Sequence, residues 1–244
     1  MKTELDYYNS HYRHVNANFD PDRYRQIVLH EHRDILRKDS RILDVGCGTG
    51  FLLKALELEG YERLWGVERD ENQYREAVQR VQRARVTHGD AFEYLQSSGE
   101  EFDVIFLYDL LEHIAKDQII PLLCLVHQSL AAGGALIIKT PNADCPFAAS
   151  RMRYVDFTHE VMFNEESIRM VLRQAGFAEI TCRPTRQAPS LRRLPVALLR
   201  AAANLFPRFF LFAYFGPPAL RWILTPNFIA VARKQTQEAA PRSA

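Results

Sequence analysis

A glycine-rich turn followed by two acidic residues is the part of the sequence best suited to hold a small ligand. The turn, residues 46–50 (GCGTG), lies between an apolar run that predicts a strand and a run that predicts a helix. Glycines at such a turn let the backbone approach a ligand and leave the N–H groups of the helix start available to it. Glu68 and Asp90 follow the next two predicted strands, where their carboxylates can accept hydrogen bonds from hydroxyl or amino groups.

Two further segments carry groups suited to proton transfer or to orienting an acceptor. In DLLEH, Asp109 and His113 are four residues apart, so a helical turn would bring them onto one face. The segment RYVDFTHE at 153–160 is dense in polar side chains, and His159 is its candidate general base or acceptor-orienting residue. The competing interpretations are that the Glu-His pair is structural, and that His159 and Asp156 only fix the loop to the sheet.

The same polar segment supplies candidate contacts to an acceptor substrate. These candidates are Arg153, Tyr154 and Asp156. The guanidinium of Arg153, with that of Arg151 nearby, can pair with a phosphate or carboxylate of an acceptor, although a solvated loop would have the same composition. No Cys or His group has the spacing of a zinc site and no carboxylate cluster requires an ion, so no metal is predicted.

Apolar runs alternate with amphipathic ones from about residue 22, which predicts strands that alternate with helices. The strands are predicted at 41–46, 64–68, 85–87, 102–108 and 135–140. The helices are predicted at 52–58 and 71–81, in a segment ending at 95, and at 117–130. This alternation favours an α/β fold with a doubly wound, mostly parallel sheet.

The pattern changes after the fifth predicted strand. Residues 141–163 are predicted as a loop, followed by a helix that Asn164 caps and that ends near Gly176. Two more strands are predicted at 177–182 and 227–232, forming a hairpin pair at the edge of the sheet. Residues 186–224 would then be an insertion between these two strands.

Taken in order, these segments resemble the class I S-adenosylmethionine-dependent methyltransferases. The resemblance covers residues 40–140 and is carried by LDVGCGTG, the acid that closes the second strand, GDAF and FDVIFLYDLLEHI. It implies a Rossmann-like, seven-stranded sheet with an antiparallel last strand, and S-adenosylmethionine as the cofactor. It also implies that Gly46, Cys47 and Gly48 lie against the methionyl part of the cofactor, with Asp44 as a supporting acid.

The resemblance also assigns residues to the nucleoside part of the cofactor. Glu68 would bind the ribose, and the Arg69 side chain would cover one face of the adenine. Asp90 would accept from the adenine amino group, Ala91 would offer a backbone N–H, and Phe92 would pack on the ring. The residues that would close the other side of the cofactor are Leu107, Tyr108 and Asp109.

The N-terminal arm and two rival classes complete this interpretation. Tyr8, Tyr12 and Arg25 are further candidates for cofactor or substrate contacts, unless the arm is only a helix packed on the sheet edge.

An NAD-linked oxidoreductase is disfavoured because Phe51 stands where the dinucleotide fingerprint has Gly or Ala, and because of the DAF segment at 90–92. A non-catalytic subunit that binds the cofactor is the other alternative.

The segment after the fifth strand narrows the resemblance. Residues 153–160, with Thr-Pro-Asn before them and FNEESIRMVLRQAGF after them, resemble methyltransferases of bacterial surface-polysaccharide and lipid-linked glycan biosynthesis. They are more loosely similar to the O-methyltransferases of ubiquinone synthesis, which carry a Thr-His in a comparable place and some of which use a divalent ion. Both resemblances imply a hydroxyl acceptor. We expect the hydroxyl of a sugar in a lipid-linked or nucleotide-linked glycan, with a quinone-precursor phenol as the alternative.

Charge is unevenly distributed along a chain whose formal net charge is only +1. Residues 180–237 contain nine Lys or Arg and no Asp or Glu, and residues 190–222 are also rich in Leu, Phe and Ala. The basic residues of that stretch are Arg192, Arg193, Arg200, Arg208 and Arg221. This composition predicts a helix that lies in a membrane interface. The alternatives are a lid over a lipidic acceptor, a homodimer contact or a helical addition to the core, and nucleic-acid binding is not expected because the rest of the chain is acidic.

We therefore expect a single methyltransferase domain over residues 1–244. Its parts are a helical arm (1–39), a cofactor-binding core (40–140), an acceptor loop and edge (141–185), a basic apolar insertion (186–224) and a last strand (225–234). Four widely spaced cysteines, no signal-peptide core and no run of about 18 apolar residues predict a cytoplasmic protein, peripheral on the inner face of the membrane.

Overall fold

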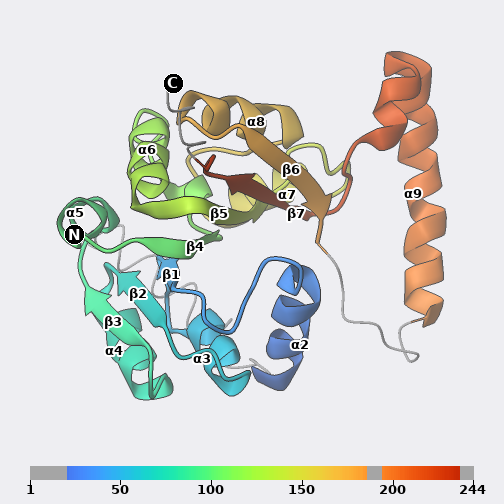
Figure 1. The fold of residues 1–244 in the computed structure, drawn as a ribbon. Helices are drawn as coiled ribbons and strands as arrows, with labels where there is room; N and C mark the ends of the chain where they lie inside the picture. The colour runs from blue at the N-terminus through green and yellow to red at the C-terminus, as the bar shows by residue number, and fades with distance from the viewer. Residues whose placement is uncertain (1–20, 186–193, 237–244) are drawn as a thin grey trace, which may run out of the picture.

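The computed structural model describes residues 21–185 and 194–236 of the chain. They form a seven-stranded sheet with the order β3-β2-β1-β4-β5-β7-β6 (Figure 1). The strands are β1 (Ile42–Val45), β2 (Leu64–Glu68), β3 (Arg85–His88), β4 (Phe102–Tyr108), β5 (Leu130–Pro141), β6 (Glu179–Pro184) and β7 (Asn227–Arg233). The first five strands pair in parallel, and β7 runs antiparallel to both β5 and β6. The predicted α/β sheet with an antiparallel last strand is confirmed.

Helices cover both faces of this sheet (Figure 1). The α-helices are α2 (Pro21–His32), α3 (Phe51–Leu58), α4 (Glu71–Arg80), α5 (Ala91–Ser97), α6 (Ile119–Ser129), α7 (Ala149–Val155), α8 (Glu165–Gln174) and α9 (Leu194–Phe215). Two 3-10 helices are η1 (Leu111–His113) and η3 (Pro217–Arg221). The strand order reverses between β1 and β4, and open α/β sheets bind ligands at the carboxyl ends of the strands at such a point.

The central strand β4 shows why its apolar run is nearly continuous. Ile105 and Leu107 belong to the core on the face covered by α5, α6 and α8, whereas Val104 and Phe106 belong to the core beneath α2 and α3. A strand that is buried on both faces needs apolar side chains in both directions. This packing fixes β4, and with it the residues that follow its carboxyl end.

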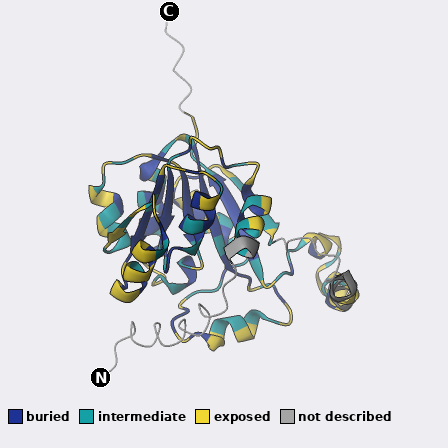
Figure 2. Cartoon of the chain, turned by 90° about the horizontal axis from the view of Figure 1, so that it is seen from below, coloured by how far each residue is buried: buried dark blue, intermediate teal, exposed yellow. Residues whose placement is uncertain are grey.

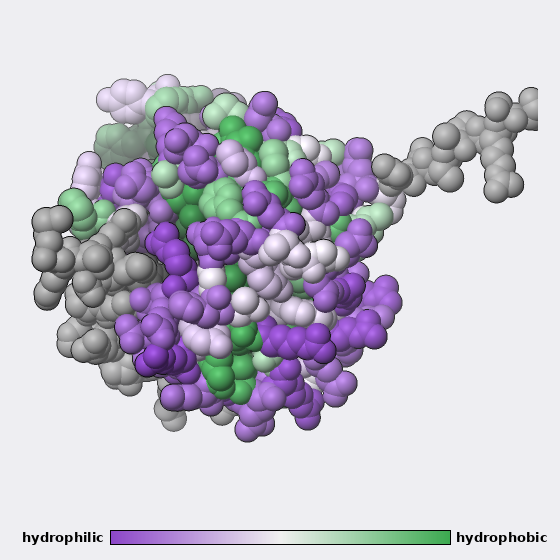
Figure 3. Space-filling view, turned by 90° about the vertical axis from the view of Figure 1, so that its left-hand side faces the viewer, coloured by the Kyte–Doolittle hydropathy of each residue, from purple (hydrophilic) through white to green (hydrophobic). Residues whose placement is uncertain are grey.

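The β3 edge of the sheet is protected by polar residues. Three of the four residues of β3 are exposed, and the sequence of the strand is RVTH. Figure 3 shows a mostly hydrophilic surface on this side of the molecule. Short, charged edge strands of this kind resist pairing with other chains.

The segment between β5 and α8 differs from the predicted loop because it contains α7. This helix has seven residues, none of them buried, and Ala148 precedes it without a side-chain cap. Neither an apolar stripe nor a capping residue therefore marks it in the sequence. The next helix was predictable, because Asn164 and Ser167 form a capping box at the start of α8.

The predicted hairpin pair is confirmed, because β7 pairs with β6 at the edge of the sheet, and β7 also joins this pair to β5. The predicted start of β5 needs a correction. Strand β5 begins at Leu130, directly after α6, so Gly133 and Gly134 lie inside the strand. A Cβ on Gly134 would lie 2.9 Å from the carbonyl oxygen of Ala131 and 3.1 Å from that of Asp103, so the glycine permits a close backbone approach.

The described part of the insertion, α9 and η3, stands away from the domain body (Figures 1 and 2). The guanidinium of Arg208 donates to the carbonyl oxygens of Leu220 (2.5 Å) and Trp222 (3.5 Å), which ties α9 to the segment after it. None of the side chains of α9 that the structure describes belongs to either core cluster, so the structure does not support the core-addition alternative. No helix of the described residues combines the length and the apolar content needed to cross a bilayer.

A buried histidine joins α2 to two strands of the sheet. Arg183 on β6 donates to Nδ1 of His32 (3.1 Å) and also to the carbonyl oxygen of Glu31, while His32 Nε2–H donates to the hydroxyl of Tyr108 on β4. Burial and the charge of Arg183 lower the pKa of His32 from 6.5 to about 3. The imidazole is therefore neutral in the folded protein at neutral pH.

This contact predicts a specific loss of stability in acid. An unfolded chain protonates its histidine below pH 6.5, whereas folded His32 stays neutral down to about pH 3, so the stability it supports is full above pH 6.5 and falls between these values. At pH 5 the loss is about 2 kcal/mol from this group. Denaturant unfolding at pH 7.5 and pH 5 measures it. We expect His32→Gln to reduce the difference by about that amount and the exposed His30→Gln to leave it unchanged; equal differences in both variants would refute the assignment.

Candidate active site

The glycine turn lies between β1 and α3, at the carboxyl end of the sheet. Gly46, Gly48 and Gly50 have φ values of +70°, +53° and +79°, in the left-handed region. A Cβ on Gly46 would lie 2.9 Å from a methyl carbon of Leu110, which belongs to the turn after β4. The backbone N–H groups of Gly46 and Cys47 both donate to the carbonyl oxygen of Val67, which anchors the turn to β2. Glycine is needed here both for the backbone conformation and for the space.

Glu68 holds the far side of this turn. One carboxylate oxygen accepts the N–H of Gly48 at 2.8 Å, and the other accepts the N–H of Asp70 at 2.8 Å. Burial raises the pKa of Glu68, while the two backbone donors oppose that rise. Each carboxylate oxygen has a second lone-pair site, so the group retains acceptor capacity for ribose hydroxyls.

Asp44 and Cys47 lie deeper than the turn itself. Asp44 is 3% exposed, and burial together with the nearby charge of Glu68 raises its pKa well above the usual range. The Cys47 thiol is buried in the core, where a Cβ on Gly66 would come within 2.9 Å of its sulfur. Burial also raises the pKa of this thiol, so the thiol stays protonated and packs in the core. Cys47 therefore contributes only its backbone to the glycine turn.

The residues expected around the adenine lie beside Glu68 across the β2–β3 pair, because Glu68 is in register with His88. Asp90 caps α5 with one oxygen, which accepts the N–H of Phe92 at 2.8 Å. Ala91 and Phe92 are partly buried against the core, and Arg69 is exposed. The placement is compatible with a nucleoside seated between Glu68 and the start of α5.

Asp109 does not share a face with His113, contrary to the sequence prediction. Its backbone has a φ of +49°, and its carboxylate pairs with Lys139 on β5. Only Leu111–His113 form a helical turn, and Asp109 precedes it and is not part of it. Tyr108, just before it, is hydrogen-bonded to His32 and is held by α2.

His113 and His159 are brought together from different loops, with ring centroids 4.7 Å apart. His113 Nδ1–H donates to the hydroxyl of Thr158 (2.9 Å), which in turn donates to a carboxylate oxygen of Asp156 (2.7 Å). His159 Nδ1–H donates to the carbonyl oxygen of Met152 at 2.6 Å. These bonds leave the lone pair of each ring on Nε2.

Glu112 completes this group, although no separate role was predicted for it. Its carboxylate is 1% exposed and accepts the hydroxyl proton of Thr140 at 3.1 Å. Burial and the charge of Asp109 raise the pKa of Glu112 to about 8, while burial and the neighbouring His159 lower that of His113 to about 4. Ligand atoms of Glu112, His113 and His159 all lie within 4.8 Å of one another. The motif DLLEHI contains both the acids and one histidine of this group. Only the fold shows that Glu112, and not Asp109, lies with the two histidines.

The candidate substrate contacts in this loop are placed differently from one another. Asp156 is 2% exposed and accepts both the N–H and the hydroxyl of Thr158, so it orders the loop and does not face an acceptor. Tyr154 is 79% exposed, and the guanidinium of Arg153 lies 5.5 Å from the centre of its ring. Arg25 pairs with Glu59 at 3.2 Å, and Tyr8 and Tyr12 lie outside the described residues.

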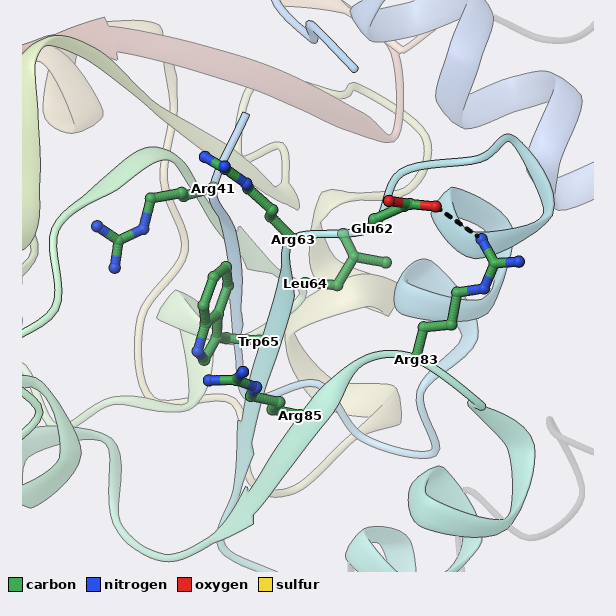
Figure 4. Close-up of a pocket in the computed structure, with 7 residues that line it drawn as sticks. All are labelled: Arg41, Glu62, Arg63, Leu64, Trp65, Arg83 and Arg85. Atoms are coloured by element: carbon green, nitrogen blue, oxygen red, sulfur yellow. Dashed lines mark hydrogen bonds and ion pairs between the residues drawn. The ribbon is translucent and has the colours of Figure 1, made fainter. Parts of the chain in front are cut away.

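A hollow of about 360 Å³ lies at the opposite end of the strands (Figure 4). It is lined by Arg41, Glu62, Arg63, Leu64, Trp65, Arg83 and Arg85. Leu64 and Arg85 begin β2 and β3, so this hollow faces away from the glycine turn. Arg83 pairs there with Glu62 at 3.4 Å and Arg41 pairs with Glu100, and we assign this hollow no part in the site.

Residues 13–181 match a family model described as a methyltransferase domain. The fold is similar to that of an S-adenosylmethionine-dependent methyltransferase from Archaeoglobus fulgidus, with 20% identity, a TM-score of 0.68, and coverage of 94% of this chain and 100% of that chain. An O-methyltransferase family protein from Burkholderia thailandensis matches with 17% identity and a TM-score of 0.59, over 87% of this chain and 56% of that chain. Phosphoethanolamine N-methyltransferase 2 of Haemonchus contortus, in complex with S-adenosyl-L-methionine, matches with 20% identity and a TM-score of 0.56, over 88% and 53%. No curated protein sequence matches the chain.

The position of Glu68 predicts the effect of removing its carboxylate. Glu68→Ala loses both the anchor of the glycine turn and the acceptor for the ribose, and hydrogen bonds to a charged group contribute about 1.5–3 kcal/mol each. We expect the Kd for S-adenosylhomocysteine, measured by calorimetry, to rise at least about tenfold. The control is Glu76→Ala, on the exposed face of α4. An unchanged Kd in Glu68→Ala would contradict the assignment.

Proposed function

We propose that this chain, which belongs to the methyltransferase domain family and is an S-adenosylmethionine-dependent methyltransferase, transfers the methyl group to a hydroxyl group. We propose a sugar hydroxyl of a lipid-linked or nucleotide-linked glycan, with a quinone-precursor phenol as the rival acceptor. The observation that supports a hydroxyl is the His113–His159 pair, which the fold holds just beyond the carboxyl ends of β4 and β5. An oxygen nucleophile of high pKa is the kind of acceptor that gains from such groups.

The described residues fit the cofactor on chemical grounds. Positive-φ glycines at the β1–α3 turn leave the backbone open, and the acids nearby suit hydroxyl and amino donors. When bound, S-adenosylmethionine supplies an activated methyl group on a sulfonium with a neutral leaving group. Gly46, Cys47 and Gly48 would hold its methionyl part, Glu68 its ribose, and Asp90, Ala91 and Phe92 its adenine.

The protein's own task is then to align the acceptor and exclude water. When the acceptor oxygen takes the methyl group, its hydroxyl proton would pass to Nε2 of His159 if this residue is the base, or to solvent if it only orients the acceptor. We assign His159 to the acceptor, because Nδ1–H is committed to Met152 and Nε2 carries the lone pair. The two roles expected for His159, general base or orienting residue, place this same atom at the acceptor oxygen.

His159→Ala tests this assignment. We expect kcat to fall at least about 100-fold, because loss of a positioned base or of acceptor alignment has an effect of that size. The Kd for S-adenosylhomocysteine should stay within about twofold, since the ring contacts His113 and the loop, on the acceptor side. Methyl transfer from a radiolabelled cofactor to glycan and phenol acceptors measures kcat. An unaltered kcat with the best acceptor would remove His159 from the reaction.

We further propose that α9 docks on an anionic membrane surface, as a peripheral contact on the inner face. Support comes from apolar side chains that the fold leaves uncovered. The large apolar residues of α9 that are exposed are Leu199, Leu205, Phe206, Phe209, Phe210, Phe212, Tyr214 and Phe215. A soluble monomer rarely exposes a patch of this kind without a partner.

Charge favours a membrane over a second copy of the chain as that partner. Residues 180–237 lack acidic side chains, and the rest of the chain is acidic overall. Arg221 is exposed. The guanidinium of Arg208 instead donates hydrogen bonds to carbonyl oxygens of the segment after α9, so Arg208 contributes less to attraction by an anionic membrane than its charge suggests. Each basic residue near an anionic surface adds about 1 kcal/mol, and each buried large apolar side chain adds about 1.5–3 kcal/mol.

The membrane proposal is tested by sedimentation with vesicles of phosphatidylglycerol and phosphatidylcholine. Both Phe206 and Phe209 are about two-thirds exposed, so replacing them together with Ser leaves the fold intact. We expect the double variant to bind the vesicles at least about tenfold more weakly than the wild-type protein. Met170→Ser, which removes an exposed apolar side chain from α8, should bind like the wild type. Failure of the wild type to sediment, or a dimer that the double variant abolishes, would overturn the proposal in favour of a homodimer contact.

A further inference from the structure

A buried carboxylate beside two imidazoles is the feature of the site that methyl transfer alone does not explain. Glu112 accepts one side-chain hydrogen bond, from Thr140, and among the described residues no Lys or Arg lies within ion-pair distance of it. The nearest candidate, Lys139, pairs with Asp109 instead. Buried carboxylates are normally paired with a cation or bound to a metal.

The two histidines beside it have the orientation that metal ligands show. In metal sites, the ring nitrogen that does not bind the ion donates to a carbonyl or carboxylate, which fixes the tautomer. His159 donates from Nδ1 to the Met152 carbonyl oxygen, and His113 donates from Nδ1 to Thr158, which is itself bonded to Asp156. With Nδ1 of each ring bonded in this way, Nε2 is the nitrogen of each ring that is suited to bind an ion, and ligand atoms of the two rings and of Glu112 all lie within 4.8 Å of one another.

The backbone holds these groups in place before any ion binds. The N–H groups of Glu160 and Val161 both donate to the carbonyl oxygen of Glu112, at 2.7 and 3.2 Å. The loop that carries His159 is therefore fastened to the 3-10 helix that carries the other two groups. Ligand atoms within 4.8 Å of one another need only small side-chain rotations to reach bonds of about 2.0–2.2 Å to one ion.

We propose that Glu112, His113 and His159 form a binding site for one divalent transition-metal ion, with Zn²⁺ preferred over Mg²⁺. Two imidazoles and one carboxylate are a ligand set suited to zinc and its neighbours, whereas Mg²⁺ prefers oxygen ligands alone. Three protein ligands leave at least one coordination position for another oxygen. This role rests on the proposed hydroxyl acceptor: the open position would hold the acceptor oxygen, His159 would orient it through the ion and not act as the base, and the hydroxyl proton would pass to solvent.

The test uses the full chain without a histidine tag, stripped with a chelator and titrated with Co²⁺. We expect one equivalent of Co²⁺ to give visible d–d absorption, Zn²⁺ to displace it, and Mg²⁺ at the same concentration to leave it unchanged. Glu112→Gln and His159→Ala should each lose the absorption, while the exposed His30→Ala keeps it. Thr158→Val, which removes the hydroxyl that links His113 to Asp156, should weaken Co²⁺ binding about 10–100-fold.

Each variant is also tested for binding of S-adenosylhomocysteine, which shows that the variant is folded. We expect this binding not to depend on the metal. Three results would each overturn the metal site. The wild type could show no Co²⁺ absorption, Glu112→Gln and His159→Ala could absorb as strongly as the wild type, or Mg²⁺ could displace Co²⁺. These readouts need neither acceptor nor turnover, so failure of the metal site is distinguished from failure of the proposed hydroxyl methylation.

Discussion

The bond between the Glu68 carboxylate and the glycine turn is the contact on which the cofactor site depends. It joins the ends of β1 and β2 through the N–H groups of Gly48 and Asp70, and so defines the space that the nucleoside would fill. A turn with three glycines at positive φ has little conformational preference of its own. The buried carboxylate of Glu68 accepts two backbone N–H groups and so holds the turn in one conformation. The acid of β2 thus has a structural task as well as the expected ribose contact.

The fold and the position of the glycine turn were predictable because their signals are local. β4 is apolar on both faces, the GCGTG turn follows a strand, and Asn164 with Ser167 caps α8. The acceptor half was not predictable in the same way. The positive φ of Asp109, its pairing with Lys139 and the burial of Asp156 all depend on how the segments after β4 and β5 pack on each other. No spacing within either segment shows that Glu112 would meet His159, because those residues come together only through backbone bonds between the two loops.

The uneven charge of the chain corresponds to two separate parts of the structure. The acidic part contains strands β1 to β5, the glycine turn and the acids near it. The basic, acid-free part, residues 180–237, contains β6 after its first residue, α9, η3 and β7, and of these elements α9 and η3 leave the domain body (Figure 1). Strands β6 and β7 carry this part into the sheet next to β5, whose end supports the acceptor loop. A membrane contact by α9 would therefore bring the acceptor side of the domain close to a lipid-linked substrate.

We expect the glycine turn and Glu68 to hold S-adenosylmethionine beside the His113–His159 pair. A crystal structure with S-adenosylhomocysteine would test this arrangement. We expect the ribose hydroxyls within hydrogen-bond distance of Glu68, the adenine beside Asp90 and Phe92, and the sulfur facing the histidine pair. A ligand bound elsewhere, for instance in the arginine-lined hollow, or one whose ribose turns away from Glu68, would contradict it.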